Sequence, residues 1–204
     1  MLIPSVKDLD VQRKRVLVRV DFNVPFDEKG HISDLTRIRA SLPTLEFLLK
    51  KNASLILLSH RGRPQGKDDS CSLKPCAQAL EKLLQRPVLF APDCLQADKL
   101  IERLTPGSVL LLENLRFYPA EEHPNLDPLF AKTLASYGDL YVNDAFAAAH
   151  RAHSSIVPIV SYFPKKAAAG FLLEKEMHAL APLLTCPQKP FHLRGVCEKA
   201  FVGK

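Results

Sequence analysis

The sequence predicts an α/β fold in which a doubly wound parallel sheet carries helices on both faces. Short runs rich in Val, Leu and Ile recur along the 204 residues, and longer amphipathic stretches lie between them. Strands that alternate with helices through short connections favour a parallel sheet. We therefore expect a Rossmann-like three-layer domain.

The predicted strands are five apolar runs, each of the length that a single strand requires. They cover residues 16–20, 55–59, 88–90, 109–112 and 140–142. A continuous apolar run is typical of a strand buried on both faces of a parallel sheet. We therefore expect helical layers to bury all five strands.

The stretches between the strands have apolar residues three and four positions apart, as in an amphipathic helix. The predicted helices cover residues 42–51, 73–85, 97–104 and 127–136. Ser72, and Asp127 followed by Pro128, are candidate helix caps because a side-chain oxygen can accept from unpaired amides and proline suits the first turn. Pro43 is expected in the first turn of its helix or at a kink.

The composition is that of an ordinary globular protein, with 47% hydrophobic residues, 25% charged residues and a formal net charge of +6. The longest apolar run, 167–173, is far shorter than the roughly 20 residues of a membrane helix. The opening MLIPSVKDLD lacks the pattern of a secretory signal. We therefore expect a cytoplasmic protein with no membrane partner.

Two further classes of site are disfavoured. The five cysteines form no Cys-x-x-Cys pair, so we expect neither disulfides nor a metal site. The chain has no Trp, 11 Phe and 4 Tyr, which argues against an aromatic platform for single-stranded nucleic acid. A nucleic-acid-binding function rests only on the pI of about 9.1, and we expect no such partner.

Polar residues follow four of the predicted strands, at the edge where open parallel sheets bind ligands. They include Asp21, Phe22, Asn23, Asp34, Arg37 and Arg39 after the first strand, His60, Arg61, Gly62 and Arg63 after the second, Glu113, Asn114 and Arg116 after the fourth, and Asn143, Asp144, His150, Arg151 and His153 after the fifth. Five of these arginines, out of 12 in the chain, suggest a common ligand: Arg37, Arg61, Arg63, Arg116 and Arg151.

The arginines indicate a small polyanion as ligand, because the guanidinium fork suits carboxylate and phosphate groups. Any one of them could instead be a surface charge, and the histidines could be structural. Asp21 and Asn23 could be turn formers ahead of Pro25. It is the convergence of several arginines that favours a ligand site.

The sequence contains neither of the common nucleotide-phosphate loops, Gly-x-x-x-x-Gly-Lys-Ser/Thr or Gly-x-Gly-x-x-Gly. The nearest segment, Gly62 to Lys67, continues into Asp68. We therefore expect arginines and helix amino ends to hold the phosphate.

Several segments together resemble the phosphoglycerate kinase family, in the family's order. They are RVDFNVP (19–25), DLTRIRASLPTLEFL (34–48), SHRGRPQG (59–66), SLKP (72–75), LLLENLRFYPAEE (110–122), VNDAF (142–146) and AHRAHSS (149–155). The resemblance extends from about residue 5 to about residue 191. AAAGFLLEKE (167–176) resembles the family's helical region near its hinge.

The resemblance implies a glycolytic phosphotransferase that exchanges phosphate between ATP and the carboxylate of 3-phosphoglycerate, with 1,3-bisphosphoglycerate as the phosphorylated acid. The family has two domains, and this chain resembles the amino-terminal, acid-binding one, expected over residues 1–189. Residues 190–204 are expected to be a hinge or an aberrant tail. ATP or ADP with Mg2+ would be bound mainly by a carboxyl-terminal domain that we expect to be absent, so the chain would not turn over alone. The family also implies a monomer.

By the same resemblance, the acid-substrate site comprises Asp21, Phe22, Asn23, Arg37, His60, Arg61, Gly62, Arg63, Arg116 and Arg151. The substrate phosphate would be bound by Arg63, Arg116 and Arg151 together with His60. Asp21 and Asn23 would hold the hydroxyl and carboxylate end. Arg37 would face the phosphoryl group in flight and is the expected catalytic residue.

The sequence departs from the family pattern in places. Arg61 stands where the family usually has Leu, and Ala147 where it has Gly, which weighs against a direct substrate role for side chain 61. After Phe191 the chain reads HLRGVCEKAFVGK in place of an apolar strand and a Gly-Gly-x-Lys-Val motif, so we expect 192–204 to pack poorly and be mobile. A non-catalytic phosphoglycerate-binding or remnant domain is the alternative function.

Overall fold

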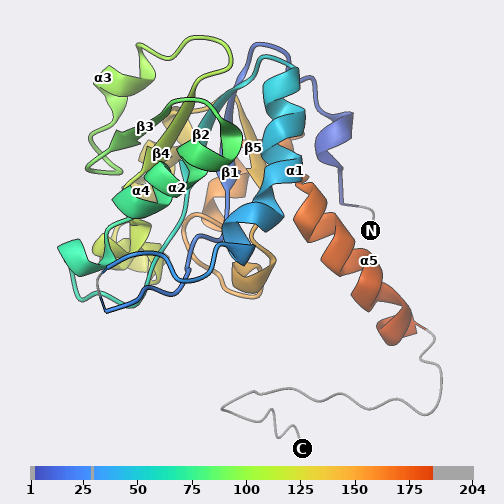
Figure 1. The fold of residues 1–204 in the computed structure, drawn as a ribbon. Helices are drawn as coiled ribbons and strands as arrows, with labels where there is room; N and C mark the ends of the chain where they lie inside the picture. Colours follow the sequence, from blue (N-terminus) through green and yellow to red (C-terminus); the bar gives the residue numbers. More distant parts are fainter. Residues whose placement is uncertain (1–2, 29, 186–204) are drawn as a thin grey trace, which may run out of the picture.

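A computed structural model describes residues 3–28 and 30–185, and the expected hinge and tail over 190–204 lie outside these residues. The described part forms one sheet of six parallel strands in the order β3-β4-β2-β1-β5-β6 (Figure 1). The strands are β1 (Arg15–Arg19), β2 (Ser54–Leu58), β3 (Val88–Ala91), β4 (Val109–Leu112), β5 (Leu140–Asn143) and β6 (Ala167–Ala169). The predicted parallel α/β sheet is confirmed.

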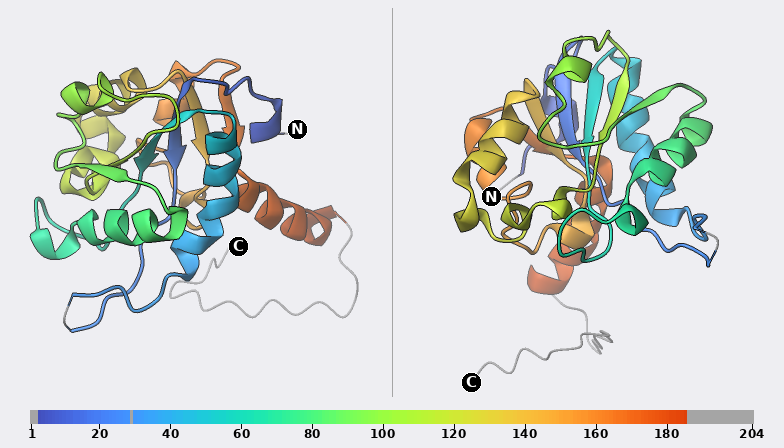
Figure 2. Two further views of the ribbon diagram at one scale, coloured as in Figure 1. Left: turned by 45° about the horizontal axis from the view of Figure 1, so that its top comes forward. Right: turned by 90° about the vertical axis from the view of Figure 1, so that its left-hand side faces the viewer.

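Helices cover both faces of the sheet (Figure 2). Val16 and Val18 of β1 pack in one cluster of buried side chains with α1 (Thr36–Lys50) and α2 (Lys74–Leu84). Leu17, between them, belongs to a second cluster with α3 (Asp98–Ile101) and α4 (Pro128–Ser136). Because alternate residues of one strand enter opposite clusters, the sheet is the middle of three layers, as predicted.

Short helical turns and one long helix complete the described part. The 3-10 turns are η1 (Val6–Asp8), η2 (Asp69–Cys71), η3 (Leu115–Phe117), η4 (Pro119–Glu121), η5 (Pro124–Leu126), η6 (Phe146–Ala148) and η7 (Pro158–Tyr162). The helix α5 (Phe171–Thr185) packs its first turn near α1 and then extends away from the sheet (Figure 1). No helix in the described ranges is long and apolar enough to cross a membrane.

The connections around β1 determine where a ligand can bind. β1 lies between β2 and β5, with Val18 opposite Leu57 on one side and Val142 on the other. The chain goes from β1 to β2 on one side and later crosses from β4 to β5 on the other. Such a switch in direction opens a crevice at the carboxyl ends of the strands.

Some predicted elements differ from the observed ones. The helix predicted to begin at Leu42 begins at Thr36, so Pro43 lies inside α1 and not in its first turn. The expected burial of all five strands is wrong for β3, because it is the edge strand and Leu89 is exposed. The predicted helix over 97–104 is only the short α3, and Ala167–Ala169, expected in a helical region, forms β6.

The two candidate caps have different outcomes. Asp127 caps α4, because its Oδ1 accepts from the backbone N–H of Leu129 at 2.9 Å. Ser72 precedes the cap position of α2, which is Leu73. The Ser72 hydroxyl oxygen still accepts from the backbone N–H of Lys74 at 3.2 Å, and the hydroxyl donates to the carboxylate of Glu113 at 2.7 Å, which ties the start of α2 to the end of β4.

Candidate functional site

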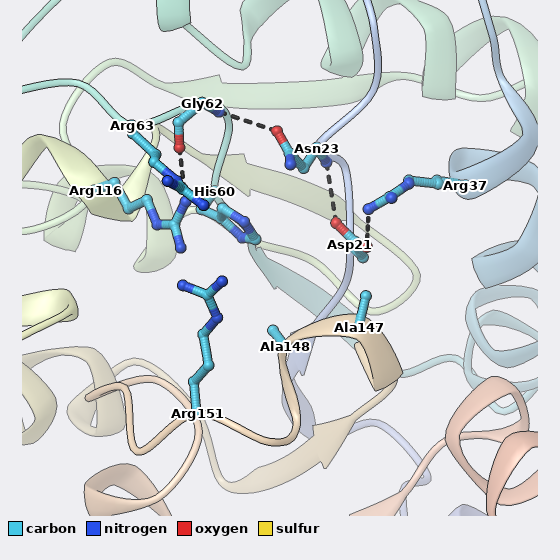
Figure 3. Close-up of a pocket in the computed structure, with 10 residues that line it drawn as sticks. All are labelled: Asp21, Asn23, Arg37, His60, Gly62, Arg63, Arg116, Ala147, Ala148 and Arg151. Carbon is cyan, nitrogen blue, oxygen red and sulfur yellow. Dashed lines mark hydrogen bonds and ion pairs between the residues drawn. The ribbon is translucent and has the colours of Figure 1, made fainter. Parts of the chain in front are cut away.

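A cavity of about 290 Å³ opens at the carboxyl ends of β1, β2 and β5, where the sequence predicted a ligand site (Figure 3). Its walls come from the loops after these strands, from the first turn of α1, and from the turns η3 and η6 with the segment that follows η6. It is lined by Asp21, Asn23, Arg37, His60, Gly62, Arg63, Arg116, Ala147, Ala148 and Arg151. The cavity therefore brings together segments that are more than a hundred residues apart in the sequence.

One side of the cavity is polar and carries both signs of charge. Arg37 donates from Nη1 to the carboxylate of Asp21, which is mostly buried. Asp21 also accepts from the backbone N–H of Asn23 at 3.1 Å, and the Asn23 side chain accepts from the N–H of Gly62 at 3.0 Å. This chain of contacts links the loop after β1 to the loop after β2 and fixes the two walls relative to each other.

The opposite side is cationic, with Arg63, Arg116 and Arg151 around the opening (Figure 3). Arg116 is buried, and its Nη1 donates to the carbonyl of Gly62 at 2.7 Å. Its Nε is also buried and has no hydrogen-bond partner among the residues that the structure describes. These guanidinium groups give the cavity a strong preference for anions.

His60 lies at the base of the cavity as a neutral imidazole. Nη2 of Arg19 lies 2.9 Å from Nδ1 of His60, and a guanidinium can only donate, so Nδ1 is the acceptor and the ring proton is on Nε2. Burial, and then the charge of Arg19, lower the pKa of His60 to about 2. His60 can therefore offer an Nε2–H donor without adding a charge.

Arg19 is itself completely buried, although it lies in a strand that the sequence analysis treated as apolar. Its Nε donates to the Ser155 hydroxyl at 2.9 Å, and that hydroxyl donates to Glu121 at 2.6 Å. The carboxylate of Glu121, also fully buried, lies 3.8 Å from Nη2 of Arg19. Through Arg19, this network fixes the His60 ring on the side away from the cavity. The sequence analysis missed it because its members are distant in sequence.

Gly62 permits a close approach of the backbone that another residue would prevent. Its φ is +63°, in the left-handed region, and a Cβ atom there would lie 2.9 Å from Sγ of Cys71. Without a side chain, its N–H reaches Asn23 while its carbonyl reaches Arg116. Gly62 is thus the junction between the polar and cationic sides of the cavity.

Two of the predicted site residues do not line the cavity. Phe22 is fully buried in the core, and its N–H donates to the Ser59 hydroxyl at 2.9 Å. The Arg61 guanidinium lies 3.2 Å from the centre of the Phe26 ring and donates to the carbonyl of Ser72 at 3.2 Å. These side chains support the loops that carry the lining residues.

The structure also adds lining residues that the sequence analysis did not assign to the site. Ala147 and Ala148 form the wall next to Asp21 and Arg151 (Figure 3). Alanine carries no chemical signal, and only its position after the polar end of β5 could have indicated this role. His153, one of the two histidines considered as ligands there, lies behind the wall, and the other, His150, accepts from Nε of Arg151 at 3.3 Å.

The chemistry available at the cavity is binding and charge stabilisation. Within residues 3–28 and 30–185, no group of three or more His, Cys, Asp and Glu side chains could hold a metal ion. Guanidinium groups and a neutral imidazole N–H suit a small anion, and the Asp21–Arg37 pair adds polar groups of both signs on the other side.

The chain is similar to proteins of one known family. The model of the family described as phosphoglycerate kinase matches residues 6–193. The chain is 52% identical over 194 residues to a phosphoglycerate kinase of Desulforudis audaxviator (strain MP104C), a match that covers 94% of this chain and 48% of that protein. It is also 52% identical over 192 residues to that of Chlamydia pneumoniae, covering 92% and 48%.

Solved structures of similar proteins have the same fold. Phosphoglycerate kinase from Coxiella burnetii superposes with a TM-score of 0.81 at 36% identity, covering 93% of this chain and 47% of that one. The enzyme from Pyrococcus horikoshii OT3 superposes with a TM-score of 0.82 at 33% identity, covering 92% and 47%. The chain thus spans about half the length of the relatives it matches.

Proposed function

Because the chain belongs to the phosphoglycerate kinase family, we propose that it is the acid-binding part of an enzyme that transfers a phosphoryl group between ATP and the carboxylate of 3-phosphoglycerate. Residues 1–189 are the proposed acid-binding domain. ATP or ADP with Mg2+, which supplies the phosphoryl group or accepts it, would be held mainly outside these residues.

The observation that carries the proposal is the cavity itself, with three arginines on one side and the Asp21–Arg37 pair on the other. We assign Arg63, Arg116 and Arg151 to the substrate phosphate, where they offer charge-assisted hydrogen bonds. The Nε2–H of His60 adds a neutral donor to the same group. Asp21 and Asn23 would hold the hydroxyl and carboxylate end.

The proposed reaction needs positioning and charge stabilisation more than covalent chemistry. The accepting carboxylate has a pKa of about 3.5 and is ionised near neutral pH, so no general base has to activate it. Arg37, at the end of the cavity away from the three arginines, would stabilise the charge of the phosphoryl group in flight. Phe22, Arg61 and Gly62 would act through the loops that they support.

Calorimetric titration of the chain with 3-phosphoglycerate tests this proposal. Arg63→Ala and Arg151→Ala should each weaken binding by about 1.5 to 3 kcal/mol, the range for hydrogen bonds to charged groups. Arg86→Ala is the matched control, because Arg86 is exposed and bonds to Gly107 at the amino-terminal edge of the sheet. Equal affinity in the wild type and both cavity variants would refute the site assignment.

A further inference from the structure

We propose that Glu122 is a positioning residue, which holds Arg116 and Arg151 at the spacing that a phosphate ester requires. The inference rests on the proposed function, because it concerns how that cavity recognises its acid. Glu122 does not line the cavity but lies behind the two arginines that do.

One oxygen of Glu122 lies close to three neighbouring side chains. Oε1 lies 2.9 Å from Nη2 of Arg116 and 3.8 Å from Nη1 of Arg151. Nε2 of His153 lies at 3.8 Å from the same oxygen. A single carboxylate thus connects the side chains that approach the cavity from η3 and from the loop after η6.

The backbone at Glu122 is fixed by the buried residues around it. The N–H of Glu122 donates to the carbonyl of Pro119 at 3.2 Å, which closes the turn η4. The preceding residue, Glu121, accepts from the N–H of Ser155 at 3.0 Å, and its carbonyl accepts from the N–H of Ser154 at 2.9 Å. The carboxylate of Glu122 therefore stands on a rigid base.

The two arginines depend on Glu122 to different degrees. Arg116 is also held by the carbonyl of Gly62, and its side chain is only 5% exposed. The Arg151 side chain is 38% exposed, and its Nε donates to its neighbour His150 at 3.3 Å. Without the carboxylate, repulsion between the two guanidinium groups would drive Arg151 toward solvent, while Arg116 would stay in place.

This role makes a specific prediction about selectivity. The negative charge of Glu122 weakens the attraction of the cavity for any anion, so its loss should not weaken the binding of a free sulfate ion, which can follow Arg151 as it moves. A phosphate ester cannot follow, because its other end is held at Asp21 and Asn23. Ordering one long side chain again on binding should cost the ester roughly twofold to tenfold in affinity.

The test compares Glu122→Gln with the wild type for two ligands, 3-phosphoglycerate and sulfate. We expect the dissociation constant for phosphoglycerate to rise roughly twofold to tenfold, with no increase for sulfate. Glu102→Gln is the matched control, since Glu102 is exposed beside α3 and lines no cavity described above. Equal weakening of binding for both ligands would mean that Glu122 only supports the local structure. Tighter binding of both ligands would mean that its charge only repels anions. Either result overturns the proposal.

A second measurement does not depend on phosphoglycerate. In the ligand-free chain, heteronuclear NMR relaxation at Nε should show Arg151 becoming mobile in Glu122→Gln while Arg116 stays ordered. Equal order of Arg151 in both proteins would overturn the positioning role even if phosphoglycerate did not bind. A wild type that binds sulfate but not phosphoglycerate would instead contradict the proposed function.

Discussion

His60 is the residue at which burial has the largest chemical consequence in the cavity. A histidine in water would be partly charged near neutral pH, but this one accepts from Arg19 and lies beside further cations. The protein thereby obtains a neutral donor where a positive charge would be expensive to bury. The arginines alone supply the charge that attracts the anion.

The protonation state of His60 can be measured from the nitrogen shifts of its ring. We expect Nε2 to be protonated and Nδ1 unprotonated throughout about pH 5 to 8, because burial and Arg19 lower its pKa from the usual 6.5 to about 2. The unfolded chain takes up this proton near pH 6.5 and the folded chain does not, so the group lowers stability as the pH falls below that value. A ring that titrates near 6.5, or that is protonated at Nδ1, would contradict the assignment.

At this scale, the sequence predicts the exposed part of the cavity better than its buried support. The arginines at 63, 116 and 151 could be predicted because they follow strand ends, and such residues meet at one edge of a parallel sheet. Arg19 could not, because an arginine in a strand gives no sign of the partner, Ser155, that will bury it. The side chain of Arg61 follows a strand end too, but a nearby aromatic ring holds it outside the cavity.

Among the elements, α5 is joined at its start to the part of the cavity wall that follows β5. Asp144, directly after β5, accepts from the N–H of Leu172 at 2.9 Å, and the Thr44 hydroxyl of α1 accepts from the N–H of Phe171 at 2.9 Å. Gly170 must lack a side chain, since a Cβ there would meet the Asp144 carboxylate. The turn η6 that follows Asp144 carries Ala147 and Ala148, so one short segment connects α5 to the cavity.

The titration of Asp144 should make the free energy of unfolding larger at low pH than at neutral pH. Burial raises its pKa from 3.8 to about 6, so between these values the folded chain holds a proton that the unfolded chain has lost. The stabilisation is complete below about pH 4 and is lost as the pH rises through 6. Two pKa units correspond to a limit of about 3 kcal/mol.

Asp144→Asn cannot titrate but keeps an oxygen that can cap α5. The difference in unfolding free energy, wild type minus variant, should therefore be larger at pH 4 than at pH 7, by up to about 3 kcal/mol. Denaturant unfolding of both proteins at several pH values measures this difference. A difference that stays constant, or that grows toward pH 7, would show that the first turn of α5 holds Asp144 ionised.

The elements that the sequence predicts well are those with a strong hydrophobic pattern. The central strands and α4 have such a pattern, and the structure confirms them. β6 consists of three alanines, which have no preference for a strand, and its place depends on pairing with β5. The start of α1 was missed because Pro43 suggested a first turn or a kink, whereas the proline lies exposed seven residues after the start of the helix, next to the buried Thr44 and Leu45.

For the whole molecule, the cavity at the carboxyl ends of β1, β2 and β5 is proposed to bind only one of the two substrates. The arginines are suited to an acid with a phosphate group, and the sequence has no nucleotide-phosphate loop of the common kinds. Phosphoryl transfer also needs water to be excluded from around the reacting groups. The cavity lies at the carboxyl edge of the sheet, where a second domain could cover it.

The chain alone should therefore show no ATP-dependent phosphorylation of 3-phosphoglycerate. A coupled assay with the purified chain measures this, and a separately made carboxyl-terminal domain should restore a trace of activity. Failure of that addition would favour the alternative, a non-catalytic phosphoglycerate-binding domain. Robust turnover by the chain alone, with contaminating host enzyme excluded, would contradict the division of substrates between two domains.

The most direct test of the central claim is to map where 3-phosphoglycerate binds, by following backbone amide NMR signals during a titration. A second cavity of about 720 Å³ beside β3 offers an alternative polar site, lined by Lys67 and Lys74 together with Asp69 and Glu113. We predict that the shifts concentrate at Asn23, Gly62 and Ala148, around the carboxyl ends of β1, β2 and β5. Shifts concentrated at Lys67 and Lys74, or no saturable shifts at all, would contradict the account.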